Sequence, residues 1–540
     1  MKNMLSNPLL PGFYPDPSIC RVGDDYYMVT SSFSYFPGVP VFHSRDLAHW
    51  EQIGHVLDRP EQLPLSPDDI SGGIFAPTIR FHDGLFYMIT TNVSVGKNFI
   101  VTAEKPEGPW SDPHWIEGAE GIDPSLFWDV DGKAYYTGTG QMQDDRGTRQ
   151  AIWLSEIDLE SFALVGERTF IWGGSLSEPA WPEAPHLYLI NGYYYLMIAE
   201  GGTEHFHSET IARAEHVKGP YHSYRGNPIL TQRHLGMNAD IANTGHADLV
   251  QCQDGSWFMV FLASRPYGGY HKNLGRETFI APVGWEDGWP VVSPGTGRIL
   301  FSYEGPNLPE YKVPELPAKD DFESEKPGYV WNFLGTPDDS LIKMEDGFLK
   351  IRLHERGLIP DENAPTGEGS LQNPSSMGFL GRRQQHLSFR TAACLAWRPK
   401  EAQTAGLTVL QHGFQQIRLE LGCREDGQTV VRALRCYRSL DVSLIHKKER
   451  GAYQEEVLRE IPWEKEETVL VIRAEGQEYT LLAAGRDGEE IPLCTVNGGF
   501  LGSETAGGFV GAYIGLFASG NGKSYDEYVP FDWFSYEPLS

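Results

Sequence analysis

The chain has 540 residues, of which 40% are hydrophobic and 12% aromatic, and it contains 59 glycines and 37 prolines. A chain of this length has room for more than one core, and its composition is typical of a turn-rich, mostly β protein rather than of a disordered or helical one. Its formal net charge of −29 argues against nucleic acid and anionic membranes as partners and favours neutral or cationic ones.

The lack of a recognisable targeting signal and the spacing of the cysteines both favour a cytoplasmic protein. The first residues hold no apolar segment of the length that a secretory signal needs, and no later stretch approaches the length of a membrane span. The six cysteines are scattered without a CxxC pair, which favours reduced structural thiols over a disulfide framework or a zinc site. We therefore expect a cytoplasmic protein with no membrane partner.

Five stretches in the N-terminal half of the chain follow one pattern. Each begins with a small or acidic residue, usually followed by proline, and continues with an alternating apolar run, a turn and an aromatic-rich run. This is the pattern of a β-hairpin. The first residues of the five stretches are Asp16, Ala76, Asp123, Ala184 and His246.

The spacing of these hairpins predicts a propeller. Successive starts are 60, 47, 61 and 62 residues apart. Such intervals suit four-stranded blades with long connections better than the shorter coils of a solenoid. A second, looser repeat with a charged turn and an aromatic residue follows most hairpins and would supply the outer strands. We predict a five-bladed β-propeller over residues 1–303.

The rest of the chain predicts a second β domain. Residues 304–318 are proline-rich and lack a hydrophobic period, which is typical of a linker. Beyond them, alternating apolar segments recur with turns between them, and the last is FDWFSYEP. They predict a concanavalin-like β-sandwich over residues 319–540, so the whole chain is expected to be all-β. The sequence has no Walker-type or dinucleotide-binding glycine motif, and a nucleotide-dependent reaction is not expected.

Acidic residues stand at or beside the start of three hairpins. Asp16 and Asp123 start the first and third, and Glu183 directly precedes the start of the fourth. Because the inner strands of a propeller line its central channel, these three carboxyl groups are predicted to converge on one axis. The alternative is that the two Asp-Pro pairs only cap turns.

Convergent carboxyl groups favour one kind of chemistry. The sequence offers neither a metal cluster nor a Ser or Cys nucleophile elbow beside these acids. Glycoside hydrolysis needs one protonated carboxyl to donate to the leaving oxygen and one ionised carboxylate to activate water or to attack. The three acids therefore predict a glycoside hydrolase.

Six segments carry a specific resemblance. They are YPDPSI (Tyr14 to Ile19), SSFSYFPGVPVFHSRDLAHW (Ser31 to Trp50), GIDPSLFWDVDGKAY (Gly121 to Tyr135), EAPHLYLINGYYYLMIAEGGT (Glu183 to Thr203), TGHADLV (Thr244 to Val250) and LGRETFIAPVGWEDGWP (Leu274 to Pro290). They resemble glycoside hydrolase family 43, and more narrowly its two-domain bacterial β-xylosidases and α-L-arabinofuranosidases. The resemblance implies an inverting, exo-acting hydrolase on a five-bladed propeller.

The resemblance also implies roles for the three acids. Asp16 matches the general base that deprotonates the attacking water, and Glu183 matches the general acid. Asp123 matches the acid that orients its partner and raises its pKa. The physical logic agrees, since a neighbouring negative charge keeps Glu183 protonated near neutral pH while hydrogen bonds keep Asp16 ionised.

Two further residues are assigned to substrate binding by the same resemblance. Arg276 matches an arginine that reaches the glycone and the neighbouring carboxylates, with a surface salt bridge elsewhere as the alternative. His246 matches a histidine that lies beneath the sugar in relatives, sometimes next to a central water or metal ion. One histidine is a weak metal signature, so a channel histidine without a metal stays equally open and no catalytic metal is expected.

Aromatic residues are expected to form the platform for a small uncharged sugar. Phe33 and Phe75 are the candidates, with core packing as the alternative for each. Many xylosidases have GVWAP where this chain has GIFAP (Gly73 to Pro77). Phe75 in place of tryptophan leaves the preferred pentose open.

The sandwich is expected to contribute as well. Relatives insert an aromatic residue from this domain to close the site, and Phe509, Tyr513 and Phe517 are the three candidates here. A structural calcium in the sandwich, held by acids such as Asp321 and Asp532, is left open, and no cofactor is required for the reaction.

The predicted function is the release of pentose from the non-reducing end of short xylo-oligosaccharides or arabinoxylo-oligosaccharides. It makes the protein a β-D-xylosidase, with α-L-arabinofuranosidase activity left open, and its partner a small neutral oligosaccharide. The alternatives are a protein that is mainly an α-L-arabinofuranosidase, a retaining or transferase enzyme on a related fold, and a non-catalytic carbohydrate-binding propeller. A binding module has no reason to keep all three acids. The oligomeric state, a homo-oligomer included, is left open.

Overall fold

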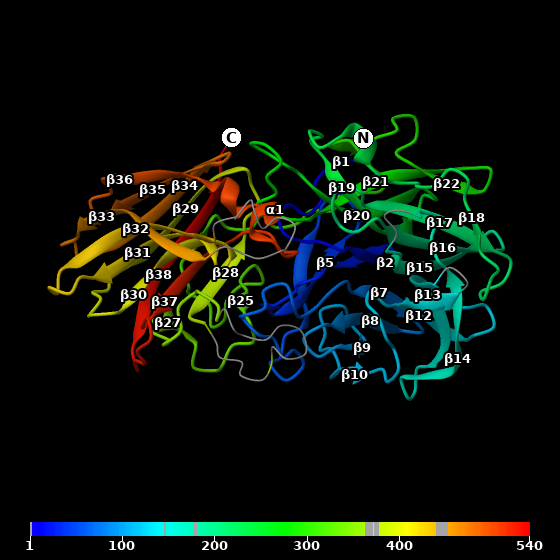
Figure 1. Cartoon of the computed structure of the whole chain (residues 1–540), viewed down its shortest axis with the longest axis horizontal. Helices are drawn as coiled ribbons and strands as arrows, with labels where there is room; N and C mark the ends of the chain where they lie inside the picture. The colour runs from blue at the N-terminus through cyan, green and yellow to red at the C-terminus, as the bar shows by residue number, and fades with distance from the viewer. Residues whose placement is uncertain are drawn as a thin grey trace.

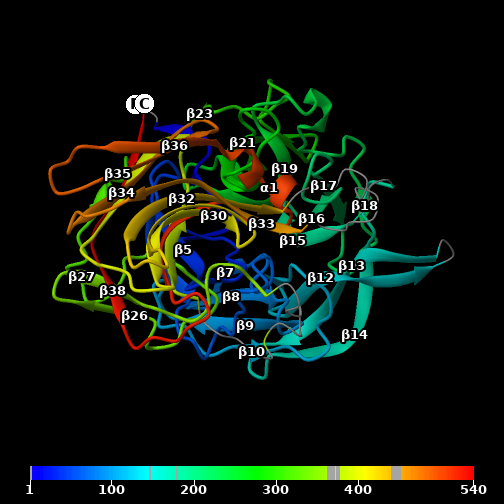
Figure 2. The same ribbon diagram turned by 60° about the vertical axis from the view of Figure 1, so that its left-hand side comes forward.

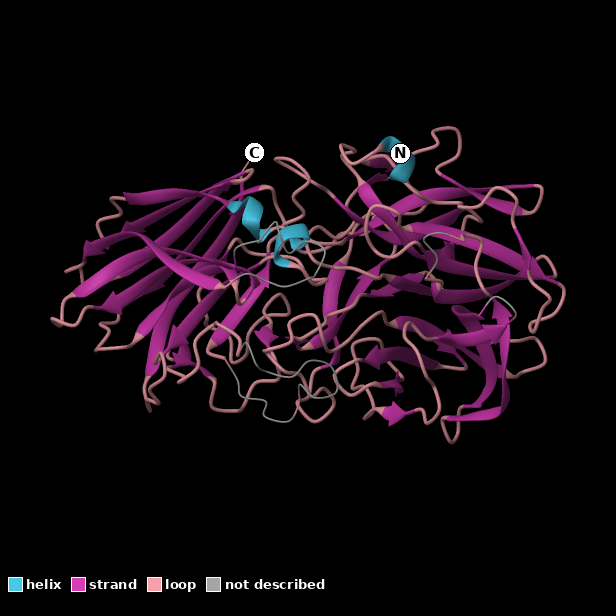
Figure 3. Cartoon of the chain, in the orientation of Figure 1, coloured by secondary structure: helices cyan, strands magenta, loops and turns pink. Residues whose placement is uncertain are grey.

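A computed structural model describes residues 3–144, 147–177, 181–361, 371, 377–438 and 452–539. Almost all of the regular structure in these residues is β-strand, as Figure 3 shows. In Figure 1 the strands up to β22 gather on the right and those from β26 onward gather on the left. The expected all-β fold is therefore confirmed. None of the helices found in the described residues has the length and apolar character needed to cross a membrane.

The N-terminal part contains five four-stranded antiparallel sheets within the described residues, each ordered along the chain from its inner to its outer strand. The first consists of β2 (Ser18–Val22), β3 (Asp25–Val29), β5 (Gly38–Ser44) and β6 (Glu51–Leu57). The second consists of β7 (Thr78–His82), β8 (Leu85–Asn92), β9 (Lys97–Ala103) and β10 (His114–Trp115). The third consists of β11 (Ser125–Trp128), β12 (Ala134–Asp144), β13 (Gly147–Asp158) and β14 (Ala163–Trp172). The fourth consists of β15 (Glu183–Ile190), β16 (Tyr193–Glu200), β17 (Ser208–Ala214) and β18 (His222–Ser223). The fifth consists of β19 (Ala242–Gln251), β20 (Trp257–Ser264), β21 (Glu277–Glu286) and β22 (Trp289–Val292).

These sheets form a closed ring. Each inner strand contacts the inner strand of the next sheet, and β19 contacts β2 to complete the circle. The five hairpins predicted from the sequence are the inner two strands of the five sheets, since β2 pairs with β3, β7 with β8, β11 with β12, β15 with β16 and β19 with β20. Aliphatic and aromatic side chains fill the space between neighbouring sheets. Each sheet is thus one blade of a propeller.

The C-terminal part is a sandwich of two antiparallel sheets. One sheet holds β24 (Lys319–Asp320), β26 (Ile342–Glu345), β27 (Phe348–Arg352), β29 (Ser388–Leu395), β34 (Thr468–Glu475), β35 (Glu478–Ala484), β36 (Ile491–Asn497) and β38 (Tyr528–Pro538). The other holds β28 (Phe379–Arg383), β30 (Thr404–His412), β31 (Gln415–Cys423), β32 (Thr429–Arg438), β33 (Tyr453–Pro462) and β37 (Tyr513–Ser519). Their inner faces share one apolar core, as the alternating pattern requires. The predicted final strand lies within β38.

Of the remaining short strands, one pair lies within the propeller part and a second pair joins the propeller to the sandwich. β1 (Met4–Ser6) pairs with β23 (Ser302–Glu304), and β4 (Tyr35–Phe36) pairs with β25 (Phe333–Leu334). The short helices are η1 (Arg233–Leu235), η4 (Gly498–Leu501) and α1 (Ser503–Ala506). Between β23 and β24 the described chain forms no strand. The exact bounds of the two domains and of the linker stay a prediction.

One loop of the sandwich reaches the propeller. It runs from α1 to β37, and α1 lies at the junction of the two parts in both Figure 1 and Figure 2. The Ala512 amide donates to the Asn273 carbonyl at 2.7 Å, and the Phe509 amide donates to Ser71 Oγ at 3.0 Å. Both propeller residues lie on loops, and these bonds hold Phe509 against the channel end.

Candidate active site

A small cavity of about 100 Å³ collects every residue that the sequence assigned to catalysis or substrate binding. Its walls are Asp16, Phe33, Phe75, Ala76, Ile122, Asp123, Glu183, Thr203, His207, His246, Arg276 and Phe509. Side chains from Asp16 to Phe509 therefore meet in one place, and the three acids converge as the repeat alignment predicted. Thr203 and His207 are additions that the sequence did not indicate.

The backbone at the start of the hairpins is unusual and repeats from blade to blade. Asp16, Asp123, Ala184 and His246 have φ of 55°, 55°, 53° and 52°. Non-glycine residues rarely adopt this left-handed conformation, which is kept where the surrounding structure enforces it. In four blades, the same local bend thus turns the chain at the channel mouth. Glu183 stands one residue before the bend of its blade and is the first residue of β15.

Hydrogen bonds with neighbouring segments hold three of these bends. The Ser31 amide donates to the Pro15 carbonyl at 3.1 Å, and the Ile122 amide donates to Thr139 Oγ1 at 3.0 Å. At the fifth blade, the Ala247 amide donates to a carboxyl oxygen of Glu209 at 3.1 Å. Hydrogen bonds therefore fix the backbone at these bends, and the side chains there are held in place more firmly than on a free loop.

Asp16 is the most strongly bonded acid of the cavity. Arg276 Nη1 donates to Asp16 Oδ1 at 2.8 Å, the Ser31 hydroxyl donates to Asp16 Oδ2, and His246 Nδ1 lies 3.6 Å from Oδ1. Burial alone would raise the pKa of Asp16, but Arg276, His246 and the Ser31 bond more than offset it and hold the pKa below its usual value. Asp16 is thus ionised at neutral pH.

Glu183 and Asp123 behave in the opposite way. Burial, and next the charge of Asp16, raises the pKa of Glu183 to about 7. Burial, and next the charges of Glu183 and Asp16, raises the pKa of Asp123 well above its usual value, although Asp123 also accepts a hydrogen bond from the Ala184 backbone. The cause expected from the sequence, the charge of Asp123, is not among the causes that raise the pKa of Glu183, which are burial and the charge of Asp16.

The charge balance of the cavity explains this behaviour. Of the described residues that line it, Arg276 alone carries a permanent positive charge, and it faces three carboxyl groups. Burial is the main cause that lowers the pKa of His246 and the pKa of His207, so neither adds a charge at neutral pH. Like charges in one buried site cannot all be ionised. A proton is therefore retained on the pair of Asp123 and Glu183, while Asp16 keeps its charge.

Arg276 also binds beyond Asp16. Its Nη1 donates to Thr203 Oγ1 at 3.2 Å, and its Nη2 donates to the Phe509 carbonyl at 3.3 Å. The guanidinium carbon lies 5.5 Å from the ring centroid of Phe33 and 5.9 Å from that of Phe509. The alternative of a distant surface salt bridge is thus wrong. Arg276 contacts Asp16, the aromatic wall and the sandwich residue Phe509.

Three phenylalanines form an apolar wall. The ring centroids of Phe33 and Phe75 are 5.2 Å apart, and Phe509 lies 6.2 Å from each of them. Of the three aromatics left open in the sandwich, Phe509 is the one at the cavity and is 44% exposed. Tyr513 instead stacks on Tyr35 with centroids 3.7 Å apart, and Phe517 is buried beside them.

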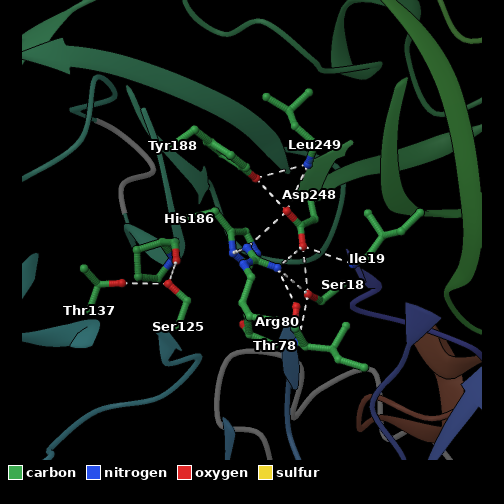
Figure 4. A network of polar contacts seen from close by, with 12 residues as sticks. Ser18, Ile19, Thr78, Arg80, Ser125, Thr137, His186, Tyr188, Asp248 and Leu249 are labelled. Atoms are coloured by element: carbon green, nitrogen blue, oxygen red, sulfur yellow. Dashed lines mark hydrogen bonds and ion pairs between the residues drawn. The ribbon is translucent and has the colours of Figure 1, made fainter. Parts of the chain in front are cut away.

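Beneath the cavity, polar residues fill the channel. The residue two positions after each hairpin start is polar and at most 4% exposed, and these residues are Ser18, Thr78, Ser125, His186 and Asp248. Side chains two apart on a strand share a face, so the same alternation that aims the acids at the cavity aims these residues at the axis. Figure 4 shows them with Arg80, which comes two residues further along β7.

Arg80 and Asp248 form the centre of this channel network. Arg80 Nη1 donates to Asp248 Oδ2 at 2.8 Å, and Ser18 Oγ and Tyr188 OH donate to the same carboxylate at 2.7 and 2.6 Å. Arg80 Nη2 donates to His186 Nδ1 at 2.9 Å, so His186 carries its proton on Nε2. Burial first, and Arg80 as well, lowers the pKa of His186 to about 3, which keeps it neutral. The network closes the channel below the site.

We predict that Asp248→Asn destabilises the propeller strongly. The substitution leaves the Arg80 guanidinium buried without its counter-charge, which typically costs about 3–5 kcal/mol. The calorimetric midpoint of the propeller should fall by roughly 5–10 °C. A matched control is Glu345→Gln, which removes the exposed ion pair with Lys350 and should leave the midpoint unchanged. Equal midpoints for the two variants would show that the Arg80–Asp248 pair does not stabilise the ring.

Over the part of the chain that the structure describes, no three His, Cys, Asp or Glu side chains form a group that could hold a metal ion. Asp321 and Asp532, considered above for calcium, belong to no such group. All six cysteines have free thiols.

The fold and this site define a glycoside hydrolase, with a propeller channel blocked at one end and three carboxyl groups at the other. The chain belongs to glycosyl hydrolases family 43, whose pattern matches residues 5–290. Residues 319–537 match the β-xylosidase C-terminal concanavalin A-like domain. The family and the concanavalin-like fold that the sequence suggested are thereby confirmed.

Similar proteins extend over the whole chain. A xylosidase/arabinosidase of Butyrivibrio fibrisolvens is 43% identical over 99% of both chains. A non-reducing end α-L-arabinofuranosidase of Bacteroides ovatus is 39% identical over 99% of this chain and 94% of its own. The crystal structure of a xylan β-1,4-xylosidase from Bacillus halodurans superposes with a TM-score of 0.87 at 32% identity, covering 99% of this chain and 100% of that one.

Proposed function

We propose that this enzyme is an inverting, exo-acting β-D-xylosidase that acts on short neutral oligosaccharides and also accepts α-L-arabinofuranosides. The observation that carries the proposal is the opposite direction of two pKa shifts in one cavity, lowered at Asp16 and raised to about 7 at Glu183. A base and an acid with separated pKa values are what glycoside hydrolysis requires. The activities named for the relatives from Butyrivibrio and Bacteroides support both pentosides.

The mechanism follows from these protonation states. Asp16 accepts a proton from a water molecule as the water attacks the anomeric carbon. Glu183 donates its proton to the glycosidic oxygen on the other face of the ring, and the configuration inverts. Asp123 accepts the Ala184 amide hydrogen bond beside Glu183 and shares the proton of the pair, so its role is to position the acid.

The shape of the cavity supports exo action. Its volume of about 100 Å³ is well below the 300–1,000 Å³ typical of sites for larger ligands, so it suits about one monosaccharide. The phenylalanine wall and the channel network close it on two sides. A single glycone unit therefore enters, and the rest of the oligosaccharide stays outside.

The experiment is a comparison of products and substrates. We expect xylobiose and xylotriose to lose one xylose at a time from the non-reducing end, and proton NMR to detect α-xylose as the first-formed anomer. Aryl β-D-xyloside and aryl α-L-arabinofuranoside should both be cleaved, and the ratio of their kcat/KM values gives the preferred pentose. Net retention would contradict the role given to Asp16, and internal cleavage of polymeric xylan would contradict exo action.

We predict a bell-shaped pH dependence of kcat/KM. Because Glu183 must be protonated, activity is lost as the pH rises through about 7. Because Asp16 must be ionised and its pKa is lowered, activity is lost only as the pH falls below the usual aspartate range. Initial rates from pH 3 to 9 on aryl xyloside at low concentration measure both limbs. A basic limb near pH 4 would show that Glu183 is not the acid.

A further inference from the structure

His207 lines the cavity, but neither the sequence motifs nor the proposed mechanism uses it. It directly precedes β17, is 1% exposed and lines the cavity with the three acids and Arg276. Its ring lies against Gly245, where an added Cβ would come within 2.7 Å of Nε2 and of Cε1. A glycine at this point leaves room for the imidazole beside the bend at His246.

The hydrogen bond on the other side of the ring fixes the tautomer. His207 Nδ1 lies 2.9 Å from the Asn243 carbonyl oxygen. A carbonyl oxygen only accepts, so Nδ1 carries the proton and Nε2 holds a lone pair. Burial is the main cause that lowers the pKa of His207 to about 4, and the ring stays neutral over the working range. Nε2 is therefore a fixed acceptor.

This acceptor has no partner within the described residues. His207 Nε2 and Arg276 Nε are both buried polar atoms of cavity residues that lack a hydrogen bond there. A buried polar atom without a partner is costly, so an arrangement with an unused acceptor and an unused donor at one cavity calls for a ligand. A sugar hydroxyl donates one hydrogen bond and accepts others, and it complements both atoms.

We propose that His207 Nε2 accepts a hydrogen bond from one hydroxyl of the bound pentose and thereby selects sugars that carry a free hydroxyl at that position. The inference rests on the proposed function and deepens it. A site built to bond a hydroxyl rejects analogues that lack the group, because its own polar atoms are then left unpaired. His207 makes the glycone pocket reject deoxy, fluoro and O-acylated pentosides at one carbon.

The test is a cycle between variants and substrates. The substrates are 4-nitrophenyl β-D-xyloside and its 2-deoxy, 3-deoxy and 4-deoxy analogues. For the native enzyme, we expect kcat/KM to fall roughly 10- to 100-fold for the analogue that lacks the bonded hydroxyl. In His207→Phe, kcat/KM for the parent xyloside should fall by a similar factor. The ratio of kcat/KM between the parent and that one analogue should then shrink to within about twofold, while the ratios for the other two analogues stay as in the native enzyme.

A matched control and a second variant separate binding from folding. His55→Phe changes another buried neutral histidine, which lies away from the cavity and bonds Gln52, and all three ratios should stay native. Gly245→Ala keeps the imidazole but displaces it, and should weaken the same ratio as His207→Phe. Folded variants with native ratios for all three analogues would overturn the proposal.

The native enzyme alone also decides one case. If it hydrolyses the parent xyloside and all three deoxy analogues with equal kcat/KM, no hydroxyl is selected and the inference on His207 fails while the proposed function stands. If it hydrolyses neither pentoside, the proposed function fails and the sugar hydroxyl is lost as the donor. The two failures are thus distinguishable.

Discussion

Replacing Asp16 by alanine is expected to lower kcat/KM by about 10⁴-fold on activated aryl xylosides and on xylobiose alike. Every substrate needs an activated water at the anomeric carbon, so a good leaving group gives no relief. The loss should come mainly in kcat, because Asp16 acts on the water in the transition state rather than on the ground-state sugar. Initial rates on the two substrates measure it.

Azide provides the confirming measurement for Asp16→Ala. The shortened side chain leaves space for a small anion on the face from which water attacks, beside the cation of Arg276. Azide should restore activity on the aryl xyloside and yield the α-xylosyl azide, the anomer opposite to the substrate. A β-xylosyl azide, or no dependence on azide at all, would place the base somewhere other than across the ring.

A second variant separates the charge of Asp16 from its volume. Asp16→Asn keeps the shape and the contacts to Ser31 and Arg276 but removes the negative charge. It should lose nearly as much activity as alanine and should not respond to azide, because the amide fills the space. The charge of Asp16 also raises the pKa of Glu183, so the residual activity of this variant should vanish at a lower pH than native activity does.

The hairpin repeat was enough to predict the ring and the convergence of the acids. Asp16, Asp123 and Ala184, which align in the repeat, also occupy equivalent positions in their blades, because all three share one left-handed bend. The same alignment also contains the channel network, since a polar residue follows each start by two positions. That regularity was readable in the sequence and indicates a closed channel rather than an open one.

Other parts of the site were beyond the repeat. Thr203 and His207 lie on the connection between β16 and β17, where no periodic pattern fixes a direction, and Phe509 comes from a sandwich loop. Its choice over Tyr513 depends on which side chain the sandwich core takes, and Tyr513 is held there by stacking on Tyr35. Sequence spacing contains no information on that packing.

The protonation pattern was predicted in direction but not in cause. A neighbouring negative charge was expected to keep Glu183 protonated, and Asp123 was the named neighbour. Within the cavity, burial acts first and the charge of Asp16 second. Burial depends on Phe33, Phe75 and Phe509 closing the wall, so the sandwich takes part in setting the acid's pKa although it supplies none of the three carboxyl groups.

Replacing Glu183 by alanine is expected to separate substrates by their leaving groups. The leaving group of xylobiose is the second xylose unit, a poorly stabilised alkoxide that needs the proton, so kcat/KM should fall by about 10³–10⁴-fold. The phenolate of an activated aryl xyloside, such as the 2,4-dinitrophenyl derivative, leaves without protonation, so kcat/KM on this substrate should fall less than about 10-fold. The pH profile of kcat/KM should also lose its basic limb, because the group that titrates near pH 7 is gone.

Asp123→Ala is the matched comparison. It also removes a carboxyl group with a raised pKa but leaves the proton donor, so its losses of kcat/KM should be similar for both leaving groups. Equal losses on both substrates for Glu183→Ala would instead assign the donated proton to Asp123, the other member of the pair.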